Sequence, residues 1–133
     1  MANRNTQGFG LIPAGTIGST PSTQGQGKYL IDAGMAVDLF QGTAVKSAAG
    51  YIVTAQAAIT NTCIGVLNGI FYNDATTKKP TFANFYNQPI TPANSEDTTA
   101  FVLDNPNQLF VGAIDAAAAQ AEYGKTYGLT VTA

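Results

Sequence analysis

The sequence predicts an all-β protein, a small β-barrel or sandwich of short antiparallel strands with an extended N-terminal arm and one short helix near the C-terminus. Short β-branched and aromatic runs recur between turn residues along the chain. The 14 glycines and 6 prolines interrupt it too often for long helices. A length of 133 residues suits one domain. We divide the chain into an arm, residues 1–27, and a single β domain, residues 28–133, with a loop excursion around 72–98.

The arm combines low charge with an apolar group, which is unusual for a solvated tail. Its only charged residue is Arg4, and six glycines and two prolines are spread along it. Disordered tails usually carry high charge and few apolar residues. We therefore expect the arm to become ordered on another surface, either its own domain or a neighbouring protein, through Phe9, Leu11, Ile12 and Ile17.

The first half of the domain is expected to contain short strands and one hairpin. Residues 28–32 form the first strand, and residues 35–40 lead into a turn at Gln41-Gly42. Residues 43–46 and 51–54 are expected to pair as a hairpin around a four-residue loop, Ser47 to Gly50.

A longer β-branched run follows at residues 62–71. Gly65 and Gly69 interrupt it, and each predicts a bulge or a sharp bend. Cys63 lies in this run and is expected to be a small buried core residue.

The excursion carries an aromatic stretch, residues 82–86, bounded by prolines 80, 89 and 92. Phe82, Phe85 and Tyr86 have no basic residues between them, which is typical of a core or an interface rather than of a nucleic-acid platform. Long excursions often carry contacts, so these three residues join the candidate partner-binding set.

The C-terminal part predicts two clear strands, residues 99–104 and 109–114, joined by a turn. Asp104 caps this turn and Pro106 fixes its backbone. Residues 116–123 are alanine-rich and predict about two helical turns, capped by Asp115 and ended at Gly124. A last strand is expected over residues 127–132, and whether residues follow 133 stays open.

Composition excludes the commonest catalytic machinery. The chain has no histidine and a single cysteine, which removes Ser-His-Asp and Cys-His catalysis and histidine-ligated zinc. Among the eight acids only Glu96 and Asp97 are adjacent, in a predicted exposed loop. Gly8-Phe9-Gly10 lacks the strand and helix that a dinucleotide motif requires. We expect no enzyme activity, no cofactor and no metal site.

Charge and hydropathy limit the kinds of partner that we expect. A net charge of −2 and scattered lysines leave no basic stripe, so nucleic acid is not an expected partner. No apolar run approaches a membrane span and no apolar segment follows Arg4 as in a secretion signal, so we expect no membrane association and synthesis in the host cytoplasm.

Two stretches resemble the head-decoration, or capsid cement, proteins of tailed bacteriophages of the marine and cyanophage type. Residues 42–45, 50–53 and 64–67 are similar to the strands of that family's small barrel core. Asp104-Asn105-Pro106-Asn107-Gln108-Leu109-Phe110 resembles the family's Asp-Asp-Pro-x-x-x-Phe turn, with Asn105 in place of an acid. These motifs are structural, so Asp104, Asn105, Pro106 and Phe110 carry over only as turn residues.

The resemblance implies a structural virion protein on the outer capsid surface. Its partners would be the major capsid protein and other copies of itself, commonly as a homotrimer, and it would stabilise the head by bridging capsid subunits. Two alternatives remain open. One is a carbohydrate- or receptor-binding module of a fibre or adhesin, with Tyr72, Phe82, Phe85 and Tyr86 as a stacking platform. The other is a self-assembling surface-layer subunit.

Overall fold

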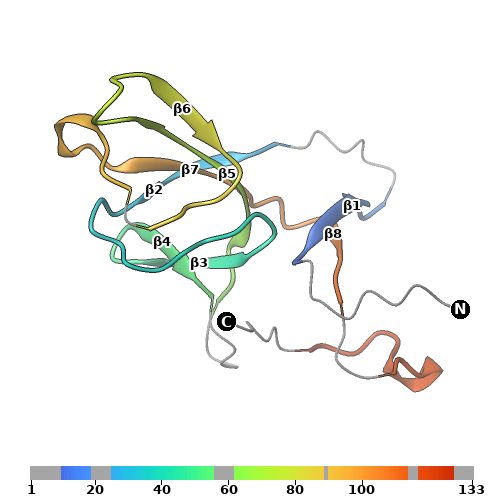
Figure 1. The fold of residues 1–133 in the computed structure, drawn as a ribbon. Coiled ribbons are helices and arrows are strands. Elements are labelled where there is room, and N and C mark those ends of the chain that lie inside the picture. Colours follow the sequence, from blue (N-terminus) through green and yellow to red (C-terminus); the bar gives the residue numbers. More distant parts are fainter. Residues whose placement is uncertain (1–9, 19–24, 56–61, 89, 114–116, 128–133) are drawn as a thin grey trace, which may run out of the picture.

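The computed structural model describes residues 10–18, 25–55, 62–88, 90–113 and 117–127. These residues form two antiparallel sheets, which confirms the predicted all-β class (Figure 1). The larger sheet has the order β2-β7-β5-β3-β4, with β6 paired to β5, and the smaller one pairs β1 with β8. The strands are β1 (Ile12–Thr16), β2 (Gly27–Ile31), β3 (Ala44–Ala48), β4 (Tyr51–Thr54), β5 (Gly65–Asn73), β6 (Pro80–Ala83), β7 (Thr98–Leu103) and β8 (Gln108–Val111). Two single-turn 3-10 helices, η1 (Ala93–Ser95) and η2 (Gln120–Glu122), complete the described elements.

The larger sheet curls so that its edge strands β2 and β4 approach each other. No hydrogen-bonded ladder joins these two strands in the described residues, so the sheet is not a closed barrel. The carboxylate of Asp97 bridges their ends instead. It accepts hydrogen bonds from the Ala33 backbone N–H, at 3.3 Å, and from the Tyr51 hydroxyl, at 3.2 Å. Asp97 therefore has a structural role that its predicted place in an exposed loop did not indicate.

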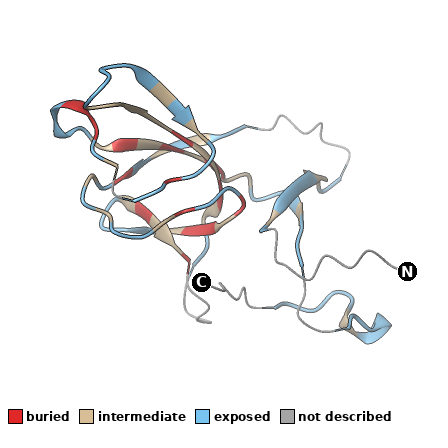
Figure 2. Ribbon diagram, viewed as in Figure 1, coloured by how far each residue is buried: buried red, intermediate tan, exposed pale blue. Residues whose placement is uncertain are grey.

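The hydrophobic core lies inside the curled sheet. Figure 2 shows the buried residues gathered on the strands of the larger sheet, whereas β1 and β8 carry none. The fully buried hydrophobic side chains come from five strands and from two connecting segments, one between β2 and β3 and one after β6. They are Ile31, Leu39, Val45, Ile52, Leu67, Ile70, Tyr86, Ala100 and Val102.

Strand β5 contains the expected bulge beside Gly69, whereas its pairing shows no register shift at Gly65. Leu67 and Ile70 are both buried. On a regular strand, two residues that are three positions apart would face opposite sides of the sheet. The register against β7 shifts between Leu67 and Gly69, so Asn68 is an extra residue in β5, and it lets the side chain of Ile70 point into the core. Gly65 serves a different purpose: a Cβ there would lie 2.3 Å from the Leu103 carbonyl oxygen, so only glycine permits the close approach of β5 and β7.

The predicted hairpin forms with a shorter loop than expected. Ser47 and Ala48 belong to β3 and pair with β4, so the turn contains only Ala49 and Gly50. Both turn residues have positive φ, 51° and 86°. Two-residue hairpin turns of this handedness match the twist of the strands. The four-residue loop is therefore wrong, because the right-handed twist of the sheet selects the tighter connection.

Two further expectations differ from the structure. Cys63 is exposed rather than buried, because β5 begins only at Gly65; its thiol contacts the Gly65 carbonyl oxygen at 3.3 Å. The predicted C-terminal helix is reduced, within the described residues, to the single turn η2, and Ala119 before it is extended (φ −102°, ψ 158°). Alanine propensity alone does not sustain a helix without a packed face.

Part of the expected C-terminal structure, Asp115 and residues 128–132 of the expected last strand, lies outside the described residues. The excursion at 72–98 is more ordered than a loop, since β5 extends to Asn73, β6 returns antiparallel to it, and η1 precedes β7.

Candidate functional site

The smaller sheet is a two-stranded ribbon formed by β1 and β8, and it lies beside the curled sheet in Figure 1. Ile12 pairs with Val111, and Gly15 pairs with Leu109. Leu109 and Val111 are two residues apart, so they share a face with Ile12. These three side chains remain 50%, 46% and 52% exposed, respectively. We call Ile12, Leu109 and Val111 the ribbon face.

The start of the ribbon is attached to the β domain of the same chain. The Leu11 backbone N–H donates to the Gly42 carbonyl oxygen at 2.9 Å. A Cβ on Gly10 would lie 3.0 Å from that same oxygen, and a Cβ on Gly42 would lie 3.1 Å from the Leu11 nitrogen. The two backbones therefore cross closely, and glycine permits the crossing. At this point the arm lies on its own domain, which is one of the two surfaces expected for it.

The end of the ribbon is fixed by the predicted turn between β7 and β8. The Asn105 carboxamide oxygen accepts a hydrogen bond from the Asn107 backbone N–H at 3.0 Å, and the Asn105 carbonyl accepts one from Gln108 at 3.0 Å. The turn is thus confirmed, with Pro106 inside it, but its capping side chain is Asn105. Phe110 follows in β8, half-buried and opposite Pro13.

Asp104 does not cap the turn as expected, because it is bound to the neighbouring strand. Its carboxylate accepts a hydrogen bond of 2.8 Å from the Tyr29 hydroxyl in β2, and this bond raises the pKa of Tyr29. A Cβ on Gly27 would lie 2.4 Å from the same carboxylate. The bond therefore joins β2 to the point where the chain leaves the larger sheet for the ribbon.

The structure distributes the seven expected partner-binding residues over different environments. Ile12 and Ile17 are exposed, at 50% and 59%, and Leu11 is half-buried. Phe82 and Phe85 are exposed, at 72% and 40%. Phe9 lies outside the described residues.

Tyr86 is wholly buried in the core, so its expected role in partner binding is wrong for this fold. Its hydroxyl donates to the Met35 carbonyl oxygen at 3.1 Å, and burial raises its pKa. Its backbone pairs with Leu39, which draws the end of the aromatic stretch into the domain. A run of three aromatics in five residues did not indicate that the last one turns inward.

A phenylalanine cluster covers part of the outer face of the larger sheet. Phe71 lies directly opposite Phe82 across β5 and β6, with ring centroids 4.7 Å apart. Phe82 also stacks on Phe101 of β7 at 6.1 Å. From the sequence we selected Phe82 and missed its two partners, although Phe101 alternates with the buried Ala100 and Val102, and this alternation is the signal that could have placed it on the outer face.

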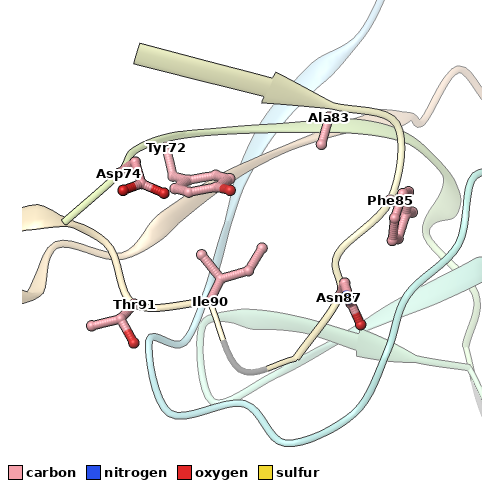
Figure 3. Close-up of a pocket in the computed structure, with 7 residues that line it drawn as sticks. All are labelled: Tyr72, Asp74, Ala83, Phe85, Asn87, Ile90 and Thr91. Atoms are coloured by element: carbon pink, nitrogen blue, oxygen red, sulfur yellow. The ribbon is translucent and has the colours of Figure 1, made fainter. Parts of the chain in front are cut away.

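A cavity of about 340 Å³ opens between the β5–β6 hairpin and the segment before η1 (Figure 3). In Figure 3 the Tyr72 ring and the Phe85 ring lie at opposite sides, and Ile90 lies below the Tyr72 ring. The lining consists of Tyr72, Asp74, Ala83, Phe85, Asn87, Ile90 and Thr91. A second hollow, of about 300 Å³, is lined by Phe40, Gln41, Asn84 and again Phe85. The rings of Phe40 and Phe85 stack at 6.2 Å.

Among the described residues that line the two hollows, Asp74 is the only charged one. Its Oδ1 accepts hydrogen bonds from the backbone N–H groups of Thr76, at 2.7 Å, and Thr77, at 2.9 Å. These bonds stabilise the carboxylate, so they lower the pKa of Asp74, and the nearby Lys78 acts in the same direction. The side chain is therefore held in place and ionised at neutral pH.

Comparison with known proteins finds no relative for this chain: no family model, curated protein or solved structure matches it. Two findings bear on the chemistry of the described residues. They contain no group of three or more His, Cys, Asp or Glu arranged to hold a metal ion, and they contain no helix long and apolar enough to cross a membrane. The candidate surfaces are thus the ribbon face, the phenylalanine cluster and the two hollows around Phe85.

Proposed function

We propose that this chain is a structural virion protein that attaches to the outer surface of a tailed-phage head and bridges neighbouring major capsid subunits. The exposed apolar ribbon face is the observation that carries this proposal. An isolated two-stranded ribbon is at best marginally stable in water. Ile12, Leu109 and Val111 form a contiguous aliphatic surface on such a ribbon. Contact with a capsid protein would cover that surface and stabilise the ribbon.

The ribbon suits a protein surface better than a charged partner. Neither β1, with the sequence IPAGT, nor β8, with the sequence QLFV, contains a charged residue. Burial of these strands therefore desolvates no ion, which is the main cost of burying charged surface. This composition agrees with the family resemblance of the Asp104–Phe110 turn, which connects β7 to the ribbon.

Attachment of this kind gains from multivalency. Each protomer would contribute a modest apolar contact, and association as a homotrimer would make the second and third contacts effectively intramolecular. Avidity would then exceed the affinity of one ribbon. No chemical step is required in this mechanism, which acts by holding capsid subunits together.

A nested pair of deletions tests the proposal. Removal of residues 1–20 eliminates β1 while leaving every residue of the buried core, which begins at Ile31. We expect the shortened protein to fold but to lose stable attachment when sedimented with heads that lack it. Removal of residues 1–9 keeps β1 and the Leu11–Gly42 bond, and it is expected to retain attachment. Normal occupancy by the protein lacking residues 1–20 would refute the proposal.

The stabilising role needs its own measurement. Heads without this protein are expected to burst at a lower temperature or at a milder osmotic shock than complete heads. Addition of the full-length protein should restore the higher value. Equal stability with and without it would show that the protein binds without reinforcing the capsid.

A further inference from the structure

The two hollows described above adjoin each other because Phe85 lines both of them. The larger hollow measures about 340 Å³ and the smaller about 300 Å³. Small-molecule sites usually begin at about 300 Å³. Each hollow is therefore large enough for one small ring-shaped unit, and the shared residue places the two units side by side.

Aromatic and aliphatic side chains supply the apolar part of both hollows. Tyr72 extends from β5 into the larger one, and Figure 3 shows Ile90 on the same side of the hollow as its ring, opposite Phe85. In the smaller one, Phe40 supplies a second ring stacked with Phe85 at 6.2 Å. Flat rings of this kind pack against the C–H faces of ring-shaped ligands and fix their orientation.

Uncharged polar groups surround these rings. Asn87 and Thr91 line the larger hollow, whereas Gln41 and Asn84 line the smaller one. Within the described part of the chain, the Asn87 and Thr91 side chains make no hydrogen bond, which leaves their donors and acceptors available to a ligand. Amide and hydroxyl groups both donate and accept, so they match hydroxyl-bearing ligands.

Charge restricts the ligand further. Among the residues that the structure describes, neither lining contains lysine or arginine, so these residues offer no cation to a phosphate, sulfate or carboxylate. Asp74 is a fixed acceptor with two backbone N–H groups on one oxygen. A carboxylate held in this way orients hydroxyl donors, and it would repel an anionic ligand.

We propose that the hollows around Phe85 bind two adjacent units of a neutral glycan. Tyr72, Phe85 and Phe40 pack against the sugar rings, while Asp74 and Asn87 orient hydroxyl groups in the larger hollow. The site is shallow and open, so its affinity as a single copy is weak, and several copies on one particle would raise it by avidity. It is separate from the ribbon face, and it does not depend on head attachment.

NMR titration of the full chain with a panel of neutral oligosaccharides tests the proposal. We expect at least one disaccharide or longer glycan to shift the resonances of Phe85 and Asn87. Phe85→Ala and Asn87→Ala should each weaken binding about tenfold, in line with the loss of one aromatic or polar contact. Tyr123→Ala is the control, because Tyr123 is also an exposed aromatic residue, at 89%, and it lines neither hollow.

Other results of the titration would contradict the glycan proposal or identify a different ligand. No shift with any neutral glycan in the panel overturns the proposal, as does equal weakening by Tyr123→Ala. Asp74→Asn keeps an acceptor for the turn but removes the charge, and it should reduce glycan binding without abolishing it. Binding confined to amine-bearing ligands and abolished by Asp74→Asn would identify a cation site and overturn the assignment to neutral sugars. A ribbon-face variant that has lost head attachment should bind the glycan normally, which separates this proposal from the cement function.

Discussion

Polar substitution of the ribbon face is the sharpest test of how the protein attaches to a capsid. We consider the triple variant Ile12→Ser, Leu109→Ser and Val111→Ser. These side chains are outside the buried core, so the variant should unfold at nearly the wild-type temperature. The cross-strand contact between Ile12 and Val111 is lost, which costs only about 0.2–1 kcal/mol.

The expected loss of affinity follows from the exposed area. Complete burial of an aliphatic side chain is worth about 1.5–3 kcal/mol. The three residues are 50%, 46% and 52% exposed, so a partner that covers the remaining half gains about 1 kcal/mol from each. The sum of about 3 kcal/mol corresponds to roughly a hundredfold in Kd for one protomer.

The assay is equilibrium binding of labelled protein to heads that lack it, with bound protein separated by sedimentation. The control is Tyr123→Ser, which removes a more exposed side chain, 89% exposed, that lies outside the ribbon face. The triple variant should bind about a hundredfold more weakly, and the control should bind like the wild type. Wild-type binding by a folded triple variant would refute the assignment of attachment to the ribbon.

Three further predictions concern the fold. Gly65→Ala places a carbon 2.3 Å from the Leu103 carbonyl oxygen. It should lower the free energy of unfolding, measured by urea titration, by about 1–3 kcal/mol. The control Gly34→Ala has its nearest contact at 3.3 Å and should lower this free energy by less. Ala49→Gly relieves the strain of a positive φ of 51°. Glycine also loses more conformational entropy on folding, so the net stabilisation of the hairpin should be about 0.5 kcal/mol. A loss of stability would contradict the turn geometry. Backbone N–H groups lower the pKa of Asp74 in the folded protein. The ionised carboxylate therefore stabilises the fold above about pH 4, and this contribution is lost as the pH falls through the lower folded-state pKa. Asp74→Asn should accordingly flatten the acid side of the curve of stability against pH.

Much of the strand pattern could be predicted from the sequence, because strand formation follows local alternation and turn residues. The expected strands at 28–32, 51–54 and 99–104 correspond closely to β2, β4 and β7. Which strands pair with each other was harder to predict from the sequence. β7 and β8 are adjacent along the chain, yet they pair with different strands, since β8 turns away at Pro106 and joins β1.

The candidate surfaces were predictable only in part, since exposure depends on contacts between distant segments. Tyr86 and Phe85 are neighbouring aromatic residues, but the backbone pairing of Tyr86 with Leu39 accompanies the burial of one while the other stays exposed. Cys63 was expected to be buried because its run of residues resembles a strand, but β5 begins two residues later. The pairing of Tyr86 joins segments far apart in the sequence, and the start of β5 is a strand boundary that the local pattern did not locate.

The pairing of β1 with β8 has a kinetic consequence. Ile12 and Val111 are near opposite ends of the sequence, whereas β3 and β4 are joined by a two-residue turn. Closing such a long loop costs more entropy, so β3–β4 should form early in folding and β1–β8 late. The ribbon buries no core side chain, so its amide hydrogens should exchange with solvent faster than those of β5 and β7. The newly made chain would thus complete its core first and close the ribbon last.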